Sequence, residues 1–231
     1  MKTLAVLLTL WAGIAQAGCR QALALALDIS GSVDSREYAL QINGLANALL
    51  HPEVQDALFF MPSSPVRLMV YQWSGPGTQQ VILDWTDVDS AATLQVIVAT
   101  IRGASRPQGD PSTAIGAALL TGLSQLSTQE ACWKRTLDVS GDGKSNTGPE
   151  PQDIRPQMSA AGITVNGLVI GTGAGDQQQT FVGELQAYYD ARVISGPDAF
   201  IETALSFGGY EAAMVRKLKR ELQGQLFSGE P

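Results

Sequence analysis

Short apolar runs typical of buried strands alternate along this chain with segments whose apolar residues recur at helical spacing. Strands are predicted at 22–29, 66–73, 80–85, 135–140, 163–170 and 192–195. Helices are predicted at 34–50, 91–101, 113–126, 151–161 and 181–189, with a mostly helical segment at 198–222. Such an alternation predicts a parallel sheet covered by helices on both faces. We therefore expect a three-layer, doubly wound α/β fold.

One pair of predicted strands departs from the parallel pattern. The runs 66–73 and 80–85 are separated by a segment that contains Ser74-Gly75-Pro76-Gly77, which predicts a hairpin turn. Strands joined by a hairpin are antiparallel. The sheet is therefore expected to be mostly parallel with one antiparallel edge strand, an arrangement found in many folds of this class.

The first residues have the pattern of a secretory signal peptide. Lys2 precedes an apolar stretch over 4–14, and Ala15-Gln16-Ala17 has the small-x-small form of a cleavage site. We expect a signal peptide at 1–17, one domain at 18–222 and a tail at 223–231, in a protein exported to the periplasm or the cell exterior. A membrane anchor at 1–17 and a lipid anchor on Cys19 remain as alternatives.

The charge of the chain bears on its partners. The formal net charge is −7, which disfavours nucleic acid and anionic lipid as partners. No segment after the first 17 residues is apolar and long enough to predict a membrane span, so stable membrane insertion is not expected. The oligomeric state stays open.

The chain has two cysteines, Cys19 and Cys132. Each comes shortly before a predicted strand, at nine residues before Asp28 and ten before Asp142. If those strands are parallel neighbours, both thiols lie at one edge of the sheet, away from the two aspartates. In an exported protein this position predicts a disulfide bond, with free thiols as the alternative.

Oxygen-bearing side chains follow the first predicted strand. Asp28, Ser30 and Ser32 alternate where the buried run gives way to a loop, and such oxygens suit a hard divalent cation. The competing interpretation is that the two serines cap the helix that begins near Asp34. Two further loops carry candidate ligands at equivalent positions, namely 109–116 with Thr113 and 138–143 with Asp142.

Together, Asp28-x-Ser30-x-Ser32, Thr113 in Thr-Ala-Ile-Gly, and Asp142-Gly143 resemble the metal-ion-dependent adhesion site of the von Willebrand factor A (VWA) domain. The order of the three motifs matches that family over nearly all of 18–231. Val139-Ser140-Gly141-Asp142-Gly143 and Asn146-Thr147-Gly148 are similar to a group of small secreted bacterial single-domain members without an assigned function.

The resemblance implies a Mg²⁺ site, with Mn²⁺ or Ca²⁺ as alternatives, whose ligands are Asp28, Ser30, Ser32, Thr113 and Asp142. It also implies that a partner's Asp or Glu completes the metal's coordination, which is binding and not catalysis. Ser112 is the alternative to Thr113. Asp110 is interpreted as a turn residue before Pro111.

Two other hypotheses stay open. The first is a metal-dependent phosphatase or hydrolase with Asp28 as nucleophile, although the usual second Asp is Ser30 and His51 is the only histidine. The second is a structural module whose metal only stiffens the loops. Asp138 lies inside an apolar run, where a buried carboxylate needs a hydrogen bond or a cation, and we expect a structural polar contact there.

Overall fold

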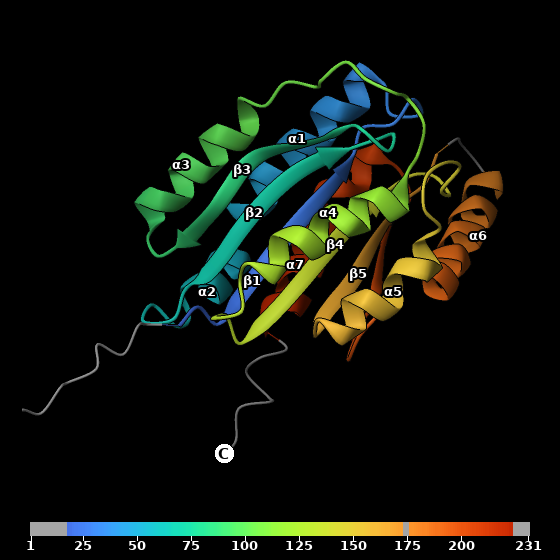
Figure 1. The fold of residues 1–231 in the computed structure, drawn as a ribbon. Coiled ribbons are helices and arrows are strands. Elements are labelled where there is room, and N and C mark those ends of the chain that lie inside the picture. The colour runs from blue at the N-terminus through green and yellow to red at the C-terminus, as the bar shows by residue number, and fades with distance from the viewer. Residues whose placement is uncertain (1–17, 173–175, 224–231) are drawn as a thin grey trace, which may run out of the picture.

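A six-stranded sheet forms the centre of the computed structural model, which describes residues 18–172 and 176–223 (Figure 1). Its order is β3-β2-β1-β4-β5-β6. The strands are β1 (Gln21–Asp28), β2 (Val66–Trp73), β3 (Gln79–Val88), β4 (Lys134–Gly141), β5 (Ile163–Ile170) and β6 (Ile201–Ala204). Every neighbouring pair is parallel except β2 and β3. This confirms the expected sheet with its antiparallel edge strand. The predicted signal peptide at 1–17 and most of the tail lie outside the described residues.

Helices cover both faces of the sheet, as expected (Figure 1). One face carries α1 (Ser35–Leu49), α2 (Pro52–Phe59), α3 (Ala91–Arg102) and α7 (Tyr210–Gln223). The other carries α4 (Ile115–Ser127), α5 (Pro151–Ala160) and α6 (Asp176–Arg192). A short 3₁₀ turn, Phe207–Gly209, precedes α7.

The central strand β1 is buried along its whole length. Its side chains alternate between two apolar clusters. Leucines point to the face of α1 and α7, and alanines point to the face of α4: Leu23, Leu25, Leu27; Ala22, Ala24, Ala26. A strand buried on both faces requires an unbroken apolar run, which explains why this segment was easily recognised as a strand.

The order of the strands determines where a site can form. From β1 the chain first adds β2 and β3 on one side, and β4, β5 and β6 follow on the other side. The order therefore reverses between β1 and β4, and ligands of doubly wound sheets bind beyond the carboxyl ends of the strands at this point. Asp28 ends β1, and Asp142 directly follows β4.

The prediction was wrong in two segments. No helix was predicted at 52–59, but α2 forms there with Pro52 in its first turn, where its missing N–H costs no hydrogen bond. The predicted strand 192–195 contributes only an isolated bridge between Ser195 and Val165, and the sixth strand is instead β6, within the segment predicted to be mostly helical. Only Ala204 of β6 is buried, so this edge strand lacks a clear apolar pattern.

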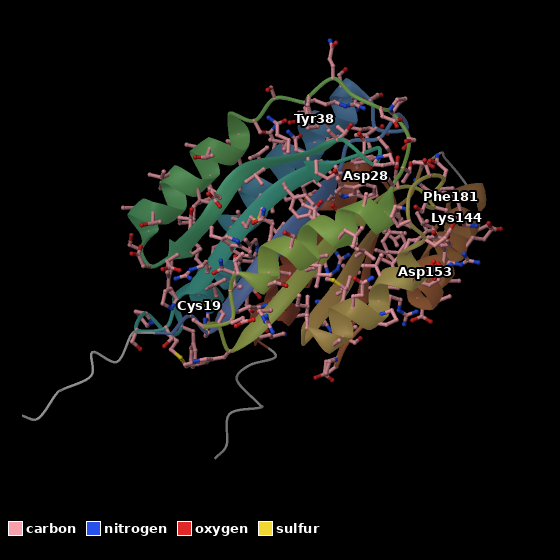
Figure 2. The ribbon with its side chains drawn as sticks, in the orientation of Figure 1. Cys19, Asp28, Tyr38, Lys144, Asp153 and Phe181 are labelled. Carbon is pink, nitrogen blue, oxygen red and sulfur yellow. A yellow bond between two sulfur atoms is a disulfide. The ribbon has the colours of Figure 1, made fainter. Side chains whose placement is uncertain are left out.

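A disulfide joins Cys19 to Cys132, as predicted. The two residues precede β1 and β4, which are parallel neighbours, so the bond lies at the amino ends of these strands. Figure 2 shows Cys19 and Asp28 at opposite ends of the molecule. The bond is therefore remote from the candidate metal ligands.

Candidate metal centre

Three loops meet beyond the carboxyl ends of β1 and β4. The Ser32 hydroxyl donates a hydrogen bond of 2.7 Å to Oδ1 of Asp142, which joins the first loop to the third. The backbone N–H of Gly31 donates to the carbonyl of Pro111 at 2.7 Å, which joins the first loop to the second. The loops that sequence motifs singled out separately thus form one cluster.

Thr113 is held in place by the segment that follows the third loop. Its N–H donates to Oδ1 of Asn146, and its carbonyl accepts from the N–H of Asn146, both at 2.9 Å. The Thr113 backbone is therefore bonded to a loop and not to a helix, which is why α4 begins at Ile115 and not at 113. Asn146 was noted in the sequence only as part of a motif, and its role as a clamp on Thr113 was missed.

The two serines of the first loop do not cap a helix. Asp34 is the N-cap of α1, and its side chain accepts from the N–H of Glu37 at 2.8 Å. The Ser30 N–H instead donates to Oδ1 of Asp28 at 2.7 Å, and the Ser30 and Ser32 hydroxyls lie 3.2 Å apart. The capping interpretation is wrong, and both hydroxyls are left beside the two aspartates.

Asp28 and Asp142 are buried carboxyls with unsatisfied oxygens. Oδ2 of each is buried without a hydrogen-bond partner. Burial, assisted by the negative charge of Asp142, raises the pKa of Asp28 to about 7. Burial also raises the pKa of Asp142, and Glu37 adds to the rise while the Ser32 hydroxyl opposes it. A buried, unpaired carboxylate is costly unless a cation neutralises it, so these residues fit a bound cation.

The donor set defines which cation fits. Within 18–172 and 176–223, no group of three or more His, Cys, Asp or Glu side chains is placed to hold a metal. A cation between Asp28 and Asp142 would therefore rely on hydroxyl oxygens and water as well as carboxylates. Hard divalent ions accept such all-oxygen sets.

The two alternative residues of the second loop have a different environment. Oδ1 of Asp110 accepts the N–H of Ser112 at 2.9 Å, which is the turn contact expected of Asp110. The hydrogen bond from the Ser112 backbone N–H lowers the pKa of Asp110. Ser112 therefore contacts Asp110 through its backbone, while its hydroxyl is buried without a hydrogen-bond partner.

Arg106 is a site residue that the sequence analysis missed. Its Nη2 donates to the carbonyls of Ile29 and Ser30, each at 2.8 Å, and so ties the loop after α3 to the first metal loop. Arg106 also lines a pocket of about 310 Å³ beside that loop, together with Ser74 and Asp110. It lies in a polar segment without regular structure, so no local pattern distinguished it from a solvated arginine.

Tyr189 of α6 is the second missed residue. It is fully buried, and its hydroxyl lacks a hydrogen-bond partner. A Cβ atom at Gly141 would lie 2.6 Å from that hydroxyl and 3.0 Å from Oδ2 of Asp28. Glycine at 141 therefore permits the close approach of Tyr189 to the carboxyl pair, and the glycine before Asp142 was the only sequence signal for it.

Comparisons with known proteins support the fold. A family described as "Protein of unknown function (DUF1194)" matches residues 18–226. No curated protein shows a significant match.

Several solved structures have the same fold. Proximal thread matrix protein 1 from the mussel byssus, with a zinc-occupied metal-ion-dependent adhesion site, has a TM-score of 0.62 at 16% identity, over 90% of this chain and 47% of that one. The pilus adhesin SpaC from Lactobacillus rhamnosus GG has a TM-score of 0.64 at 16% identity, over 90% of this chain and 31% of SpaC. A von Willebrand factor type A protein from Catenulispora acidiphila has a TM-score of 0.56 at 14% identity, over 88% of this chain and 42% of that protein. This chain spans less than half of each, and the similarity shows a VWA-like fold.

Proposed function

We propose that this chain, which belongs to the DUF1194 family of proteins of unknown function, binds a divalent cation and, through it, an acidic group of a protein partner. The observation that carries the proposal is the pair of buried carboxyls, Asp28 and Asp142, each with an unsatisfied oxygen beside serine hydroxyls. The VWA-like fold supports it, because two structures with this fold are described as a pilus adhesin and as a matrix protein with a metal-occupied adhesion site.

The proposed ligands are Asp28, Ser30, Ser32, Thr113 and Asp142. Two carboxylates and three neutral hydroxyls suit Mg²⁺, which keeps water ligands readily, and Mn²⁺ or Ca²⁺ are the alternatives. The mussel protein holds zinc in the corresponding motif, so zinc belongs in the same test. A bound cation would supply positive charge and a coordination position for an incoming oxygen.

The charge around the site explains why an acidic partner would need the cation. Asp28 and Asp142 lie together, and Glu37 is close enough to raise the pKa of Asp142. Without a cation this surface repels a carboxylate. Once the cation is bound, a partner's Asp or Glu can complete its coordination, and the pocket beside Arg106 can receive a neighbouring side chain of the partner.

Binding is favoured over hydrolysis because the described residues offer the site no histidine. His51 precedes α2, after the far end of α1, and α1 begins near the metal loops. The 15 residues of α1 separate them by roughly 20 Å. Ser30 replaces the second Asp that phosphatases of this type use, and a serine cannot act as a general acid at neutral pH.

Export is part of the proposal. The Cys19–Cys132 disulfide supports it, because such bonds persist in oxidising compartments. Among the helices of 18–172 and 176–223, none has the length and hydropathy needed to cross a membrane. Sequencing the mature N-terminus tests the predicted cleavage after residue 17.

Calorimetry tests the cation site. We expect the purified mature protein to bind Mg²⁺ or Mn²⁺, and a double variant Asp28→Ala, Asp142→Ala to lose that binding. A matched control replaces two exposed aspartates on helices α2 and α5, Asp56→Ala and Asp153→Ala, and should bind cations like the wild type. Equal cation binding by wild type and by the Asp28, Asp142 variant would contradict the site.

Peptide binding tests the partner chemistry. A library of short peptides that contain Asp or Glu, with Asn and Gln versions as controls, is titrated with Mg²⁺ and with a chelator. The proposal expects binding of acidic peptides only with the cation. If cation binding is retained but no acidic peptide binds, the site has a structural role and partner capture is wrong.

A further inference from the structure

A buried polar cluster that contains none of the proposed metal ligands joins α7 to the sheet. It consists of Asp138 of β4, Asn166 of β5, and Lys217 and Glu221 of α7, all with exposed fractions of 2% or less. Asp138 was expected to make a structural polar contact, and Lys217 is its partner. Charged side chains are almost never this deeply buried unless they are paired.

The distances within the cluster are short. Nζ of Lys217 lies 3.1 Å from Oδ1 of Asp138 and 3.1 Å from Oε1 of Glu221. The same Oε1 accepts a hydrogen bond of 2.8 Å from the Asn166 amide. The ring of Phe200 covers the amine, with its centroid 4.5 Å from Nζ. One amine therefore lies between two carboxyl groups in a site shielded from water.

The two carboxyls differ in their environment. Glu221 accepts a hydrogen bond from the Asn166 amide. Neither oxygen of Asp138 has a hydrogen bond of good geometry, even though Nζ of Lys217 is close to Oδ1. Burial raises the pKa of Asp138 to about 7; Lys217 opposes this rise and Glu221 adds to it. The raised pKa of Asp138 makes its neutral acid accessible near neutral pH, and this is the form that an amine can attack.

We propose that Lys217 and Asp138 form an intramolecular amide bond, with Glu221 as the proton carrier. The bond would link Nζ of Lys217 to Cγ of Asp138 and would join α7 covalently to β4. The inference is independent of the proposed cation site, because none of these side chains is a proposed metal ligand.

The atoms of the reaction balance without a co-reactant. At the start Lys217 is an ammonium, Glu221 a carboxylate and Asp138 a neutral acid. Glu221 takes one proton, and the nitrogen lone pair attacks Cγ of Asp138. The C–N bond forms, the bond from Cγ to the hydroxyl breaks, and the hydroxyl leaves as water with a second proton from the nitrogen, relayed by Glu221. The products are an amide, one water molecule and protonated Glu221.

Two physical effects favour this reaction in the folded protein. The reacting groups are held within contact distance, and such positioning replaces a bimolecular encounter by an effectively unimolecular step. The reaction also converts a buried ammonium and a buried carboxylate into uncharged groups, and buried charges are costly even when they are paired.

Mass spectrometry of the reduced mature protein tests the proposal. The intact mass should be lower than the sequence mass by one water molecule. Trypsin should release peptide 136–144 covalently linked to peptide 217–219, because a modified Lys217 resists cleavage. Recovery of peptide 136–144 at its unmodified mass, together with cleavage after Lys217, would overturn the proposal. A link between 217–219 and 221–231 would place the amide on Glu221 and also overturn it.

Variants test the role of each group. Asp138→Ala and Glu221→Gln should both have the full mass, and their fold is checked by circular dichroism. Glu211→Gln, an exposed position of α7, is the matched control and should keep the link. If Glu221→Gln forms the link as completely as wild type, Glu221 is not the proton carrier. The wild-type peptide result decides the amide bond even if the variants fail to fold.

Discussion

Asp28 and Asp142 combine two properties that rarely occur together, namely deep burial and an oxygen without a partner. In the absence of a cation, a proton is what relieves the cost of burying Asp28, and this is why its pKa is raised to about 7. A proton and a metal ion therefore compete for the same carboxyl pair, and the stability of the metal-free protein should depend on pH.

The first prediction concerns stability in a chelator. Because the pKa of Asp28 rises from 3.8 to about 7 on folding, the folded state binds the proton more tightly, and stability falls as pH rises from about 4 to 7. We expect the free energy of unfolding to be lower at pH 8 than at pH 5, by about 2–3 kcal/mol. Urea unfolding followed by tryptophan fluorescence measures it.

Controls separate Asp28 from the other carboxyls whose pKa is raised. Asp28→Asn should have a weaker pH dependence in chelator than wild type, and added Mg²⁺ should restore stability to the wild type at pH 8. Identical pH profiles for wild type and Asp28→Asn in chelator would show that Asp28 does not carry the effect.

A second prediction distinguishes the two candidate residues of the second loop. Thr113→Val keeps the side-chain shape but removes the hydroxyl, and it should weaken Mg²⁺ binding by roughly tenfold or more, as expected when a polar ligand worth about 1–3 kcal/mol is lost. Ser112→Ala is the matched control, because it removes the neighbouring hydroxyl and keeps the backbone contact with Asp110. Calorimetry at pH 8 measures both. The reverse order of effects would assign the ligand to Ser112.

At the scale of elements, Arg106 connects the loop between α3 and α4 to the first metal loop. Arg106 bonds two carbonyls of the first metal loop. Arg106→Ala should weaken Mg²⁺ binding by about tenfold, because hydrogen bonds from a charged donor contribute about 1.5–3 kcal/mol. Arg102→Ala, which removes an exposed contact with Asn47, is the control. Unchanged affinity in Arg106→Ala would show that the loop keeps its shape without this contact.

The elements also show what could be predicted from the sequence. Strands β2 and β5 have the predicted bounds, because buried strands need continuous apolar runs. The first and third metal loops were predicted because their residues follow strand ends, and the second, between α3 and α4, because its Thr113 motif resembles that of the VWA domain. Arg106, Tyr189 and Asn146 were not predicted to act at the site, because their roles depend on contacts with residues far away in the sequence. The edge strand β6 was missed for the same reason, since its pairing with β5 and not its own pattern makes it a strand.

At the scale of the whole molecule, stability and binding depend on opposite ends of the sheet. The double variant Cys19→Ala, Cys132→Ala should lower the free energy of unfolding by about 2–4 kcal/mol, because the bond closes a long loop of the unfolded chain. The affinity for Mg²⁺ should not change, since the bond lies far from Asp28 (Figure 2). Urea unfolding and calorimetry on the same samples measure both. A large loss of cation affinity would show that the two ends are coupled.

The two ends of the described domain leave it on the same side. Arg20 bonds to carbonyls of α2, and the last residues of α7 line a pocket with α2, so both lie at the amino end of β1 (Figure 1). Asp28 lies at the other end. A domain fixed to a support through either end therefore turns its metal loops toward the surrounding medium. An immobilised sample on a biosensor chip would keep the whole binding face free, whichever terminus carries the tag.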